Sequence, residues 1–290
     1  MENNAIKNKY EFVMLFDVEN GNPNGDPDAE NMPRTDPETT LGIVTDVCLK
    51  RKIRNYVEIA KEGEEGYNIL IKPDRSLNSK FTDAYNTMGL ETNQKGKNKD
   101  DVNKAREYIC ANYFDVRTFG AVMSTGDDPC GIVRGPVQLN FARSIDPVNA
   151  QDITITRQAK TTEDRQNDKG TTEMGKKSFV PYGLYRAEGY VSALLAQKVT
   201  GFNDDDLELL WTAIINMFEN DRSAARGKMC MRKLYIFKHD SALGNAPSHI
   251  LFDKICIEKN PDVFFPRKFG DYNITVDRTM PAGIEFIEKI

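Results

Sequence analysis

Four aspartates lie near one another in the first part of the chain: Asp17, Asp26, Asp28 and Asp36. Carboxylates gathered around one loop can hold Mg²⁺ or act as acid and base on RNA. Asp-Pro and Gly-Asp pairs are also common where a chain turns. The residues alone leave both interpretations open, a nuclease centre and a loop stabilised by turns.

The chain has only two histidines, His239 and His249, and neither stands at a useful spacing from a cysteine, a serine or another metal ligand. Residues 170–176 fit the beginning of a P-loop. Lys177, however, stands where a Ser or Thr would bind Mg²⁺, no apolar strand precedes the segment, and the residues after it are strand-like. We therefore expect no ATP site, no metal and no cofactor.

Four basic residues fill positions 50, 51, 52 and 54 of a helix predicted over 43–61. At 100° per residue the apolar residues form one stripe, and Lys50, Arg51 and Arg54 share one flank beside it. A basic helix flank is most often simply solvated. Here only Asp46 and Glu58 accompany the cations in a chain that is acidic overall, so we consider phosphate binding as well.

The elements before this helix determine what it can face. Residues 10–18 are apolar on both alternations, which predicts a strand in the middle of a sheet with both faces covered. A loop rich in Asn, Gly, Pro and Asp then runs to about residue 41, and ordered loops of this length are usually functional. Arg34 in this loop is a further candidate for phosphate contact.

Several ordered blocks of the sequence resemble the backbone subunit, of the RAMP superfamily, of type I CRISPR Cascade complexes, subtype I-C. They include NPNGDPD at 22–28, VTDVCLKRKIRNY at 44–56 and VPYGLYR at 180–186. The other matching blocks are 33–34, 36–39, 117–121 and 135–138. The resemblance covers most of the chain and is weakest at 72–115 and after residue 238.

The resemblance implies an α+β fold with a modified RRM or ferredoxin-like core, an antiparallel sheet with packed helices. It also implies that copies of the chain line up along one CRISPR guide RNA and hold its backbone, while base segments pair with target DNA. Expected partners are other Cascade subunits (a guide-end cap, a large and a small subunit), and no membrane. Because type I backbone subunits are non-catalytic as a family, we expect no enzymatic activity and assign the loop aspartates to turns.

Two other functions remain as alternatives. Related subunits of type III complexes cleave target RNA with an aspartate in this general area, so an RNA-cleaving subunit that uses a first-loop aspartate is one of them. The other is a plain protein–protein scaffold that binds no RNA.

The composition is compatible with an RNA-binding assembly subunit. With 290 residues, 39% of them hydrophobic, the chain can bury a sizeable core. Its net charge of −5 argues against a free, non-specific nucleic-acid binder but is compatible with a local basic groove. Five cysteines without paired spacing indicate reduced thiols and a cytoplasmic protein. No run reaches the roughly 20 apolar residues of a membrane span.

The rest of the pattern is compatible with a ferredoxin-like or RRM-type sheet. Strands are predicted at 67–71, 115–119, 136–143, 179–193 and 231–238, and helices at 100–113 and 203–218. We expect residues 1–290 to form one domain with two insertions, a helical, finger-like one at about 73–115 and a thumb at 145–180. Residues 153–156 would form one arm of a projecting β-hairpin thumb, although composition alone also fits a disordered surface loop.

Several basic residues outside the helix complete the predicted RNA contacts. Arg117 and Arg134 flank a glycine-rich segment whose backbone N–H groups could approach phosphates. Arg143 lies on the polar face of the strand at 136–143, and in the thumb Met174 could wedge between bases. The candidate RNA-binding residues are Asn22, Asn24, Arg34, Lys50, Arg51, Arg54, Arg117, Arg134, Arg143, Arg157, Lys160, Arg165, Met174, Lys176 and Lys177.

Overall fold

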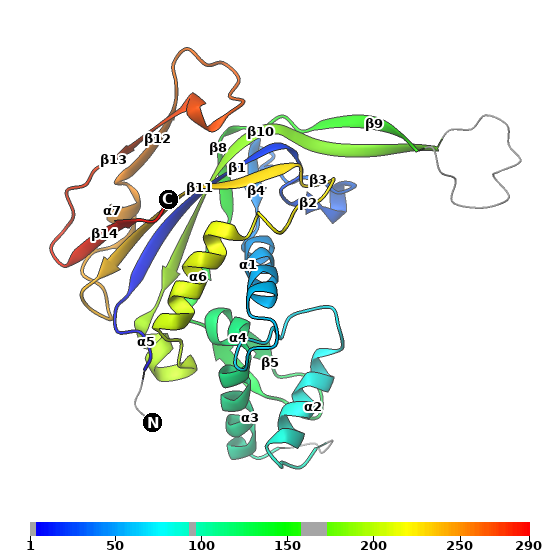
Figure 1. Ribbon diagram of the computed structural model, residues 1–290, viewed down its shortest axis with the longest axis vertical. Coiled ribbons are helices and arrows are strands. Elements are labelled where there is room, and N and C mark those ends of the chain that lie inside the picture. Colours follow the sequence, from blue (N-terminus) through cyan, green and yellow to red (C-terminus); the bar gives the residue numbers. More distant parts are fainter. Residues whose placement is uncertain (1–3, 93–96, 158–172) are drawn as a thin grey trace, which may run out of the picture.

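A large antiparallel sheet forms the centre of the protein (Figure 1). The computed structural model describes residues 4–92, 97–157 and 173–290. Within them the main sheet follows the path β14–β11–β1–β10–β8–β4, and β7 and β9 also pair with β10. The bounds are Tyr10–Gly21 (β1), Leu41–Val44 (β4), Val137–Leu139 (β7), Ala142–Pro147 (β8), Gln151–Arg157 (β9), Glu173–Val191 (β10), Lys228–His239 (β11) and Ile284–Glu288 (β14).

Strand β1 lies between β10 and β11, with antiparallel pairing on both sides. Each of its residues from Tyr10 to Val18 is buried. Phe12 belongs to the hydrophobic core on one face of the sheet, and Leu15 belongs to the core on the other face. The expectation of a central strand covered on both sides is therefore confirmed.

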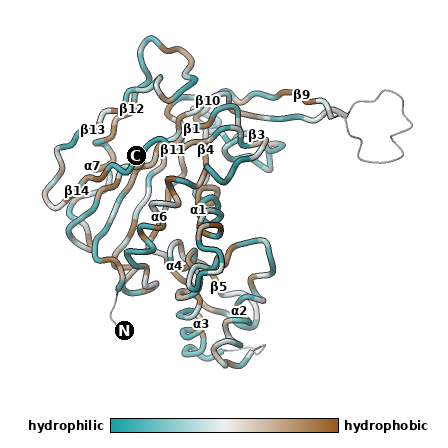
Figure 2. The backbone as a smooth tube through the Cα atoms, in the orientation of Figure 1, coloured by the Kyte–Doolittle hydropathy of each residue, from teal (hydrophilic) through white to brown (hydrophobic). Residues whose placement is uncertain are grey.

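Two helices cover the first face of the sheet, α1 (Asp46–Ala60) and α6 (Asp204–Asn216). Helix α6 begins with a capping box between Asn203 and Asp206 and buries Trp211, whose ring meets Phe12 edge-on at 5.1 Å between centroids. Figure 2 shows hydrophobic and hydrophilic residues together along α1, as expected for a helix with one buried side.

The second face is covered by the C-terminal part of the chain. Helix α7 (Ser248–Phe252) and the two-stranded sheet of β12 (Ile255–Lys259) and β13 (Tyr272–Val276) pack there with the alternate residues of β1, β10 and β11. A 3-10 helix, η4 (Phe269–Asp271), precedes β13. None of the helices in the described ranges is long and apolar enough to cross a membrane.

A helical unit with its own hydrophobic core, distinct from the two cores of the sheet, extends below α1 in Figure 1. Its elements are α2 (Leu77–Thr87), α3 (Lys99–Asn112), α4 (Phe114–Phe119), β5 (Gly120–Met123) and β6 (Gly131–Arg134). Two short helical turns, α5 (Ala193–Leu195) and η3 (Ala196–Thr200), follow β10. In the first loop lie β2 (Gly25–Asp26), η1 (Pro27–Ala29) and β3 (Met32–Pro33).

Two buried ion pairs join this helical unit to the helices on the sheet. The Arg117 guanidinium of α4 contacts both carboxylate oxygens of Asp206 at 2.8 and 2.7 Å, and its remaining nitrogen donates to three backbone carbonyls. Arg54 of α1 donates from Nε to Asp115 of α4 at 2.8 Å. The other hydrogen bonds of Asp115 come from the backbone N–H groups of Leu70 and Ile71.

The predicted strands at 67–71 and 115–119 are wrong. Residues 114–119 form helix α4, which is buried on every side and therefore shows no helical period in its sequence. In the segment before it, only Asn68 forms an isolated bridge, to Tyr113. The N–H groups of Leu70 and Ile71 bond to Asp115 instead of to a strand.

The strand predicted at 136–143 is interrupted. Leu139 pairs with Gly189 and Arg143 with Arg186, so this side has one residue more than β10 between the two pairs. Such a bulge moves the following side chains to the opposite face. Phe141 is consequently 52% exposed rather than buried with Val137 and Leu139, contrary to the alternation in the sequence.

The coarse fold class, mixed α/β with a large antiparallel sheet, is confirmed. Strand β9 pairs with the first part of β10, from Gln151↔Phe179 to Arg157↔Glu173, and this hairpin projects from the sheet (Figure 1). The return strand thus begins earlier than the expected position near residue 179. The RRM-like core and the division into one domain with two insertions stay predictions.

We expect Arg117→Met to lower the free energy of unfolding by about 3–5 kcal/mol, because removal of one partner leaves the Asp206 carboxylate buried without a compensating charge. Urea unfolding measures this difference. Arg134→Met is the control, since Arg134 is exposed and its replacement should change stability by no more than about 0.5 kcal/mol. Equal destabilisation of both variants would show that the buried pair contributes nothing specific.

Candidate nucleic-acid interface

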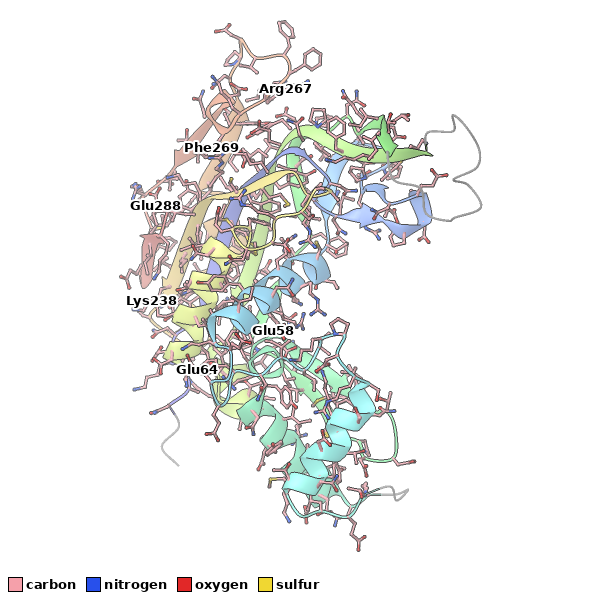
Figure 3. All side chains as sticks on the ribbon, turned by 45° about the vertical axis from the view of Figure 1, so that its right-hand side comes forward. Glu58, Glu64, Lys238, Arg267, Phe269 and Glu288 are labelled. Atoms are coloured by element: carbon pink, nitrogen blue, oxygen red, sulfur yellow. The ribbon has the colours of Figure 1, made fainter. Side chains whose placement is uncertain are left out.

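Helix α1 lies between the β9–β10 hairpin and the helical unit (Figures 1 and 3). Its first turn is capped by Thr45, whose hydroxyl oxygen accepts a hydrogen bond from the Cys48 N–H at 3.3 Å. The side-chain oxygen of Asn24 accepts from both the N–H and the hydroxyl of Thr45, each at 2.9 Å. The long first loop is therefore fixed to the start of α1.

Lys50 and Arg51 are the half-buried cations on the flank of α1. The Lys50 ammonium lies 3.0 Å from Asp46 and 3.4 Å from the side-chain oxygen of Gln138, and 5.6 Å from the centroid of the Phe119 ring. Nη1 of Arg51 donates to the carbonyl of Ile71 at 2.6 Å. Each cation retains further N–H donors that these contacts do not use.

The other two basic residues of the helix face inward. Arg54 is 8% exposed and held by Asp115. Lys52, which is not on the predicted flank, is buried against Asp221. Burial lowers the pKa of the Arg51 guanidinium, and the charge of Arg54 lowers it further. The flank therefore offers a ligand only Lys50 and Arg51 of the three predicted cations, because Arg54 is bound to Asp115.

Arg34 lies beside the start of the same helix. Its N–H donates to the carbonyl of Asn24 at 3.1 Å, and its carbonyl accepts from Ile43 at 2.9 Å. The guanidinium is 3.4 Å from Asp26, while its Nε is buried without a hydrogen-bond partner. Asn22 donates to the carbonyl of Asn31 at 2.7 Å, and its side-chain oxygen is buried and also without a hydrogen-bond partner. Polar atoms left in this state are costly unless a further group satisfies them.

Three of the four aspartates of the nuclease hypothesis are engaged separately through their carboxylates, and the fourth, Asp28, is exposed. Asp17 is buried between Arg232 at 2.9 Å and the Tyr182 hydroxyl at 3.0 Å. Asp26 accepts from the N–H of Asp28 and caps η1. Across the described ranges, no group of three or more His, Cys, Asp or Glu residues could hold a metal ion.

Asp36 forms an Asx-type turn. Its carboxylate accepts from the N–H groups of Glu38 and Thr39 at 3.0 and 3.3 Å and pairs with Arg143 at 2.9 Å. The Glu38 N–H and then the Arg143 guanidinium hold the pKa of Asp36 below its usual value. This carboxylate is therefore a turn-forming anion at neutral pH rather than a proton donor.

The remaining candidates lie away from α1. Arg134 is exposed on β6, next to a hollow that also contains Lys198. Arg143 faces a hollow shared with Ile257 of β12. Lys176 is exposed on the hairpin, 3.6 Å from Asp152, and Lys177 is half-buried beside it. Lys160 and Arg165 lie outside the described residues, as do the side chains of Arg157 and Met174.

The structure therefore places Lys50 and Arg51 on the flank of α1 and Arg34 in the loop that Asn24 fixes to the start of the same helix. It places Arg117 in a structural ion pair and separates Arg134, Arg143 and the hairpin cations from this group. Gln138 of β7 is a neighbour of Lys50 that the sequence analysis did not list as an RNA-binding residue. The alternation at 136–143 places Gln138 on the polar face of the strand, and this pattern could have identified it.

Known proteins resemble this chain over most of its length. The family model for CRISPR-associated protein Cas7 matches residues 8–277. CRISPR-associated protein Cas7 of Haloferax volcanii is 27% identical over an alignment 247 residues long, and the match covers 79% of this chain and 69% of the relative.

Two solved structures give weaker similarities. One is a "CRISPR RNA-guided surveillance complex, pre-nicking", with a TM-score of 0.49, 13% identity and coverage of 79% and 78% of the two chains. The other is the Type III-B Cmr-beta bound to cognate target RNA, with a TM-score of 0.43, 11% identity and coverage of 79% and 61%. The family match extends over nearly the whole chain, and the chain belongs to the Cas7 family of CRISPR-associated proteins.

Proposed function

We propose that the chain is a non-catalytic backbone subunit of a Cascade-type antiviral complex, of a subtype I-C kind, in which several copies bind one guide RNA. The observation that carries this proposal is the pair of cations with unused donors on the flank of α1, Lys50 and Arg51, with Arg34 in the loop beside the start of the helix, in a member of the Cas7 family. Cations with unused donors suit the phosphate backbone of a single strand. The protein thereby holds the backbone, and base pairing with target DNA reads the sequence.

The acidic character of the chain fits this arrangement. A net charge of −5 disfavours binding of nucleic acid over the whole surface, so the guide is held where cations are locally concentrated. Other copies and further subunits of the complex then complete the path of the guide. Cytoplasmic assembly is part of the same proposal.

The architecture that we propose is one RRM-like domain with two insertions. Along the chain its core consists of β1, α1, the interrupted strand β7–β8, β10, α6 and β11. In the sheet the order is β11, β1, β10 and then β7–β8, both parts of which pair with β10. The helical unit with α2 and α3 is the finger-like insertion, and the β9–β10 hairpin is the thumb. Each insertion flanks α1 on one side, so the guide lies along α1 between them (Figure 3).

An RNA-cleaving subunit is the second candidate function. The contacts of Asp36 support a non-catalytic role, because its Oδ1 accepts from two turn N–H groups and its Oδ2 pairs with Arg143, whereas a general base or a metal ligand needs a carboxylate oxygen free to face the substrate. Membership of the Cas7 family does not by itself decide between a cleaving and a non-cleaving subunit, so the choice rests on these hydrogen bonds.

The first test of guide binding is co-expression of the protein with a CRISPR array, after which we expect purification with RNA of one defined length. Lys50→Ala combined with Arg51→Ala should reduce the retained RNA. The salt dependence should flatten by about 0.7 in slope for each phosphate of a single strand that the variant no longer binds. Arg54 is left intact because its removal would leave the charge of Asp115 buried without a cation.

Lys61→Ala is the matched control, since Lys61 ends the same helix and pairs with Glu64 at 2.7 Å. We expect it to leave RNA content and slope unchanged. If the double variant also behaves like the wild type, the flank of α1 is only a solvated surface and the proposed guide site is wrong.

For the absence of catalysis, we expect guide-loaded protein to leave a complementary RNA intact in the presence of Mg²⁺. Gel analysis of a labelled RNA over several hours provides the measurement. Cleavage by the wild type that disappears in Asp26→Ala or Asp36→Ala would establish the RNA-cleaving alternative. Both variants should first be checked for folding, because each carboxylate stabilises a turn.

For the hairpin, we expect replacement of residues 155–176 by a short Gly-Ser linker to leave a folded protein that no longer assembles regularly along the guide. Folding should survive because β1, β11 and α6 make their core contacts elsewhere. Thermal unfolding and nuclease protection of the guide report the two properties separately. Full-length complexes that protect the guide as the wild type does would show the hairpin to be passive.

A further inference from the structure

A continuous border runs between β8 and β12 on the face of the sheet opposite α1. Two hollows lie along it. One is lined by residues 140, 141 and 143–145 and by Ile257 of β12, and the next, of about 470 Å³, by residues 146–149 and by Lys259 of β12. Ala142 belongs to the core under the helices, whereas Ile145 packs with the opposite core. The border is therefore a surface separate from the flank of α1. We call it the β8–β12 track.

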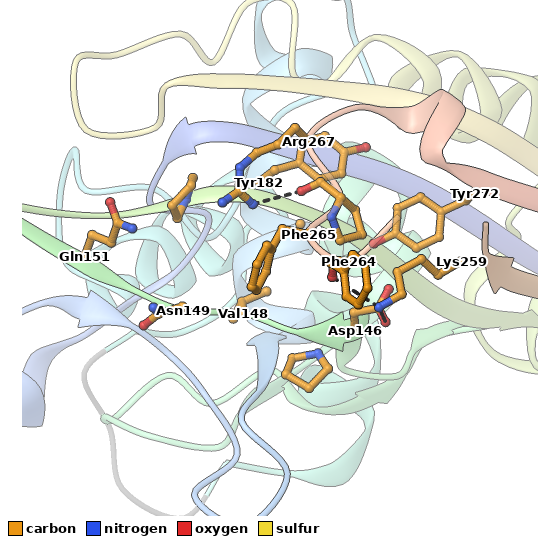
Figure 4. A pocket seen from close by; sticks show the side chains of 14 residues that line it. Asp146, Val148, Asn149, Gln151, Tyr182, Lys259, Phe264, Phe265, Arg267 and Tyr272 are labelled. Carbon is orange, nitrogen blue, oxygen red and sulfur yellow. Dashed lines mark hydrogen bonds and ion pairs between the residues drawn. The ribbon is translucent and has the colours of Figure 1, made fainter. Parts of the chain in front are cut away.

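Exposed aromatic rings stand at both ends of the track. Phe141 is 52% exposed at one end, and Phe264 and Phe265 are 85% and 77% exposed at the other, beside the second hollow (Figure 4). Adjacent phenylalanines with this exposure are unfavourable in water unless a partner covers them. Two side by side at one end of a hollow mark a binding surface rather than scattered exposed residues.

The loop that presents these rings is well ordered. The carboxylate of Asp271 accepts from the N–H groups of Arg267 and Lys268 at 2.8 and 3.2 Å, and the carbonyl of Asp271 accepts from Asn260 at 2.9 Å. Lys259 donates to the carbonyl of Phe264 at 3.3 Å. The backbone is held on both sides of Phe264 and Phe265, so the rings are presented outward by a fixed loop and a ligand need not order it first.

Cations and amides alternate with the rings. Arg267 is exposed and donates to the carbonyl of Pro266; among the described residues it has no carboxylate within ion-pair distance. Arg143, with a side chain 53% exposed, lies in the first hollow next to Phe141, where Glu188 is the lining carboxylate; Nη1 of Arg143 pairs with Asp36 at 2.9 Å, and its other nitrogens remain for a ligand. The second hollow also contains the exposed amides of Asn149 and Gln151 at the base of the hairpin. Asp146, 3.7 Å from Lys259, is the carboxylate in that hollow.

We propose that the β8–β12 track binds a single-stranded nucleic acid, with bases stacked on Phe264, Phe265 and Phe141 and phosphates on Arg267 and Arg143. Aromatic rings spaced among cations are the combination that binds single strands without sequence preference, because every base has a face that stacks. Amides at the hollow can hydrogen-bond base edges. An apolar protein partner would have no use for the amides and the unpaired guanidinium. The site is independent of the guide contact at α1.

The test uses the guide-loaded full-length protein and fluorescent oligothymidylate and oligouridylate of about 15 nucleotides, a length comparable to single-strand binding sites. Neither probe should be complementary to the guide. We expect Phe264→Leu combined with Phe265→Leu to weaken binding about tenfold or more in anisotropy titrations, because leucine keeps the apolar surface and removes the stacking face. Arg267→Gln should reduce the salt slope by about 0.7. The two probes distinguish DNA from RNA as the occupant.

Leu243→Ala is the matched control, an exposed apolar residue in the loop before α7, and should bind both probes as the wild type does. All variants should retain their guide RNA. Unchanged binding in the double leucine variant would overturn the proposal, and so would loss of self-association in sedimentation experiments without loss of probe binding, which would assign the track to a protein partner. Loss of the guide together with the probes would assign it to the guide instead of a second strand.

Discussion

Two carboxylates without exposed side-chain surface, Asp115 and Asp206, constrain the arrangement of the whole protein. A buried carboxylate is tolerated only with a cation and further hydrogen bonds around it. Asp115 takes Arg54 from α1, and Asp206 takes Arg117 from α4. The helical unit is thereby joined to both helices that cover the sheet. Since each pair also binds backbone groups, these junctions specify one orientation rather than a sliding apolar contact.

The same pairs decide which cations remain for a ligand. Arg54 lies on the flank that the sequence predicts, yet its guanidinium contacts a carboxylate 61 positions away. Arg117 is likewise bound to a partner 89 positions away. Helical spacing indicates direction but not distant partners, so the sequence could not distinguish a structural arginine from a ligand-binding one at either position. Among the described residues no buried carboxylate contacts Lys50 or Arg51, so both retain unused donors.

The elements that could be predicted are those whose apolar residues recur with a regular period, because each face of the element lies either against the core or in solvent along its whole length. The strand β1, the helix α1 and the helix α6 with its acidic first turn are of this kind. Helix α4 could not be predicted, because burial on every side removes the polar face that reveals a helix. The bulge between β7 and β8 inverts an alternation that looks uninterrupted, and only the pairing with β10 shows where the extra residue lies. The exposure of Phe141 follows from that single residue.

Strand β10 connects the projecting hairpin to the main sheet. Its first part forms the hairpin with β9, and its later part lies between β1 and β8 in the sheet. At the transition Tyr182 donates to Asp17 of β1, and Asp17 pairs with Arg232 of β11, so three strands are tied at the base of the hairpin. Burial raises the pKa of Tyr182, with the charge of Asp17 adding to the effect, so the phenol stays a donor. The base of the hairpin is consequently fixed to the sheet by these contacts. In the proposed complex, a guide RNA that meets the hairpin therefore encounters an arm whose base is fixed to three strands of the sheet.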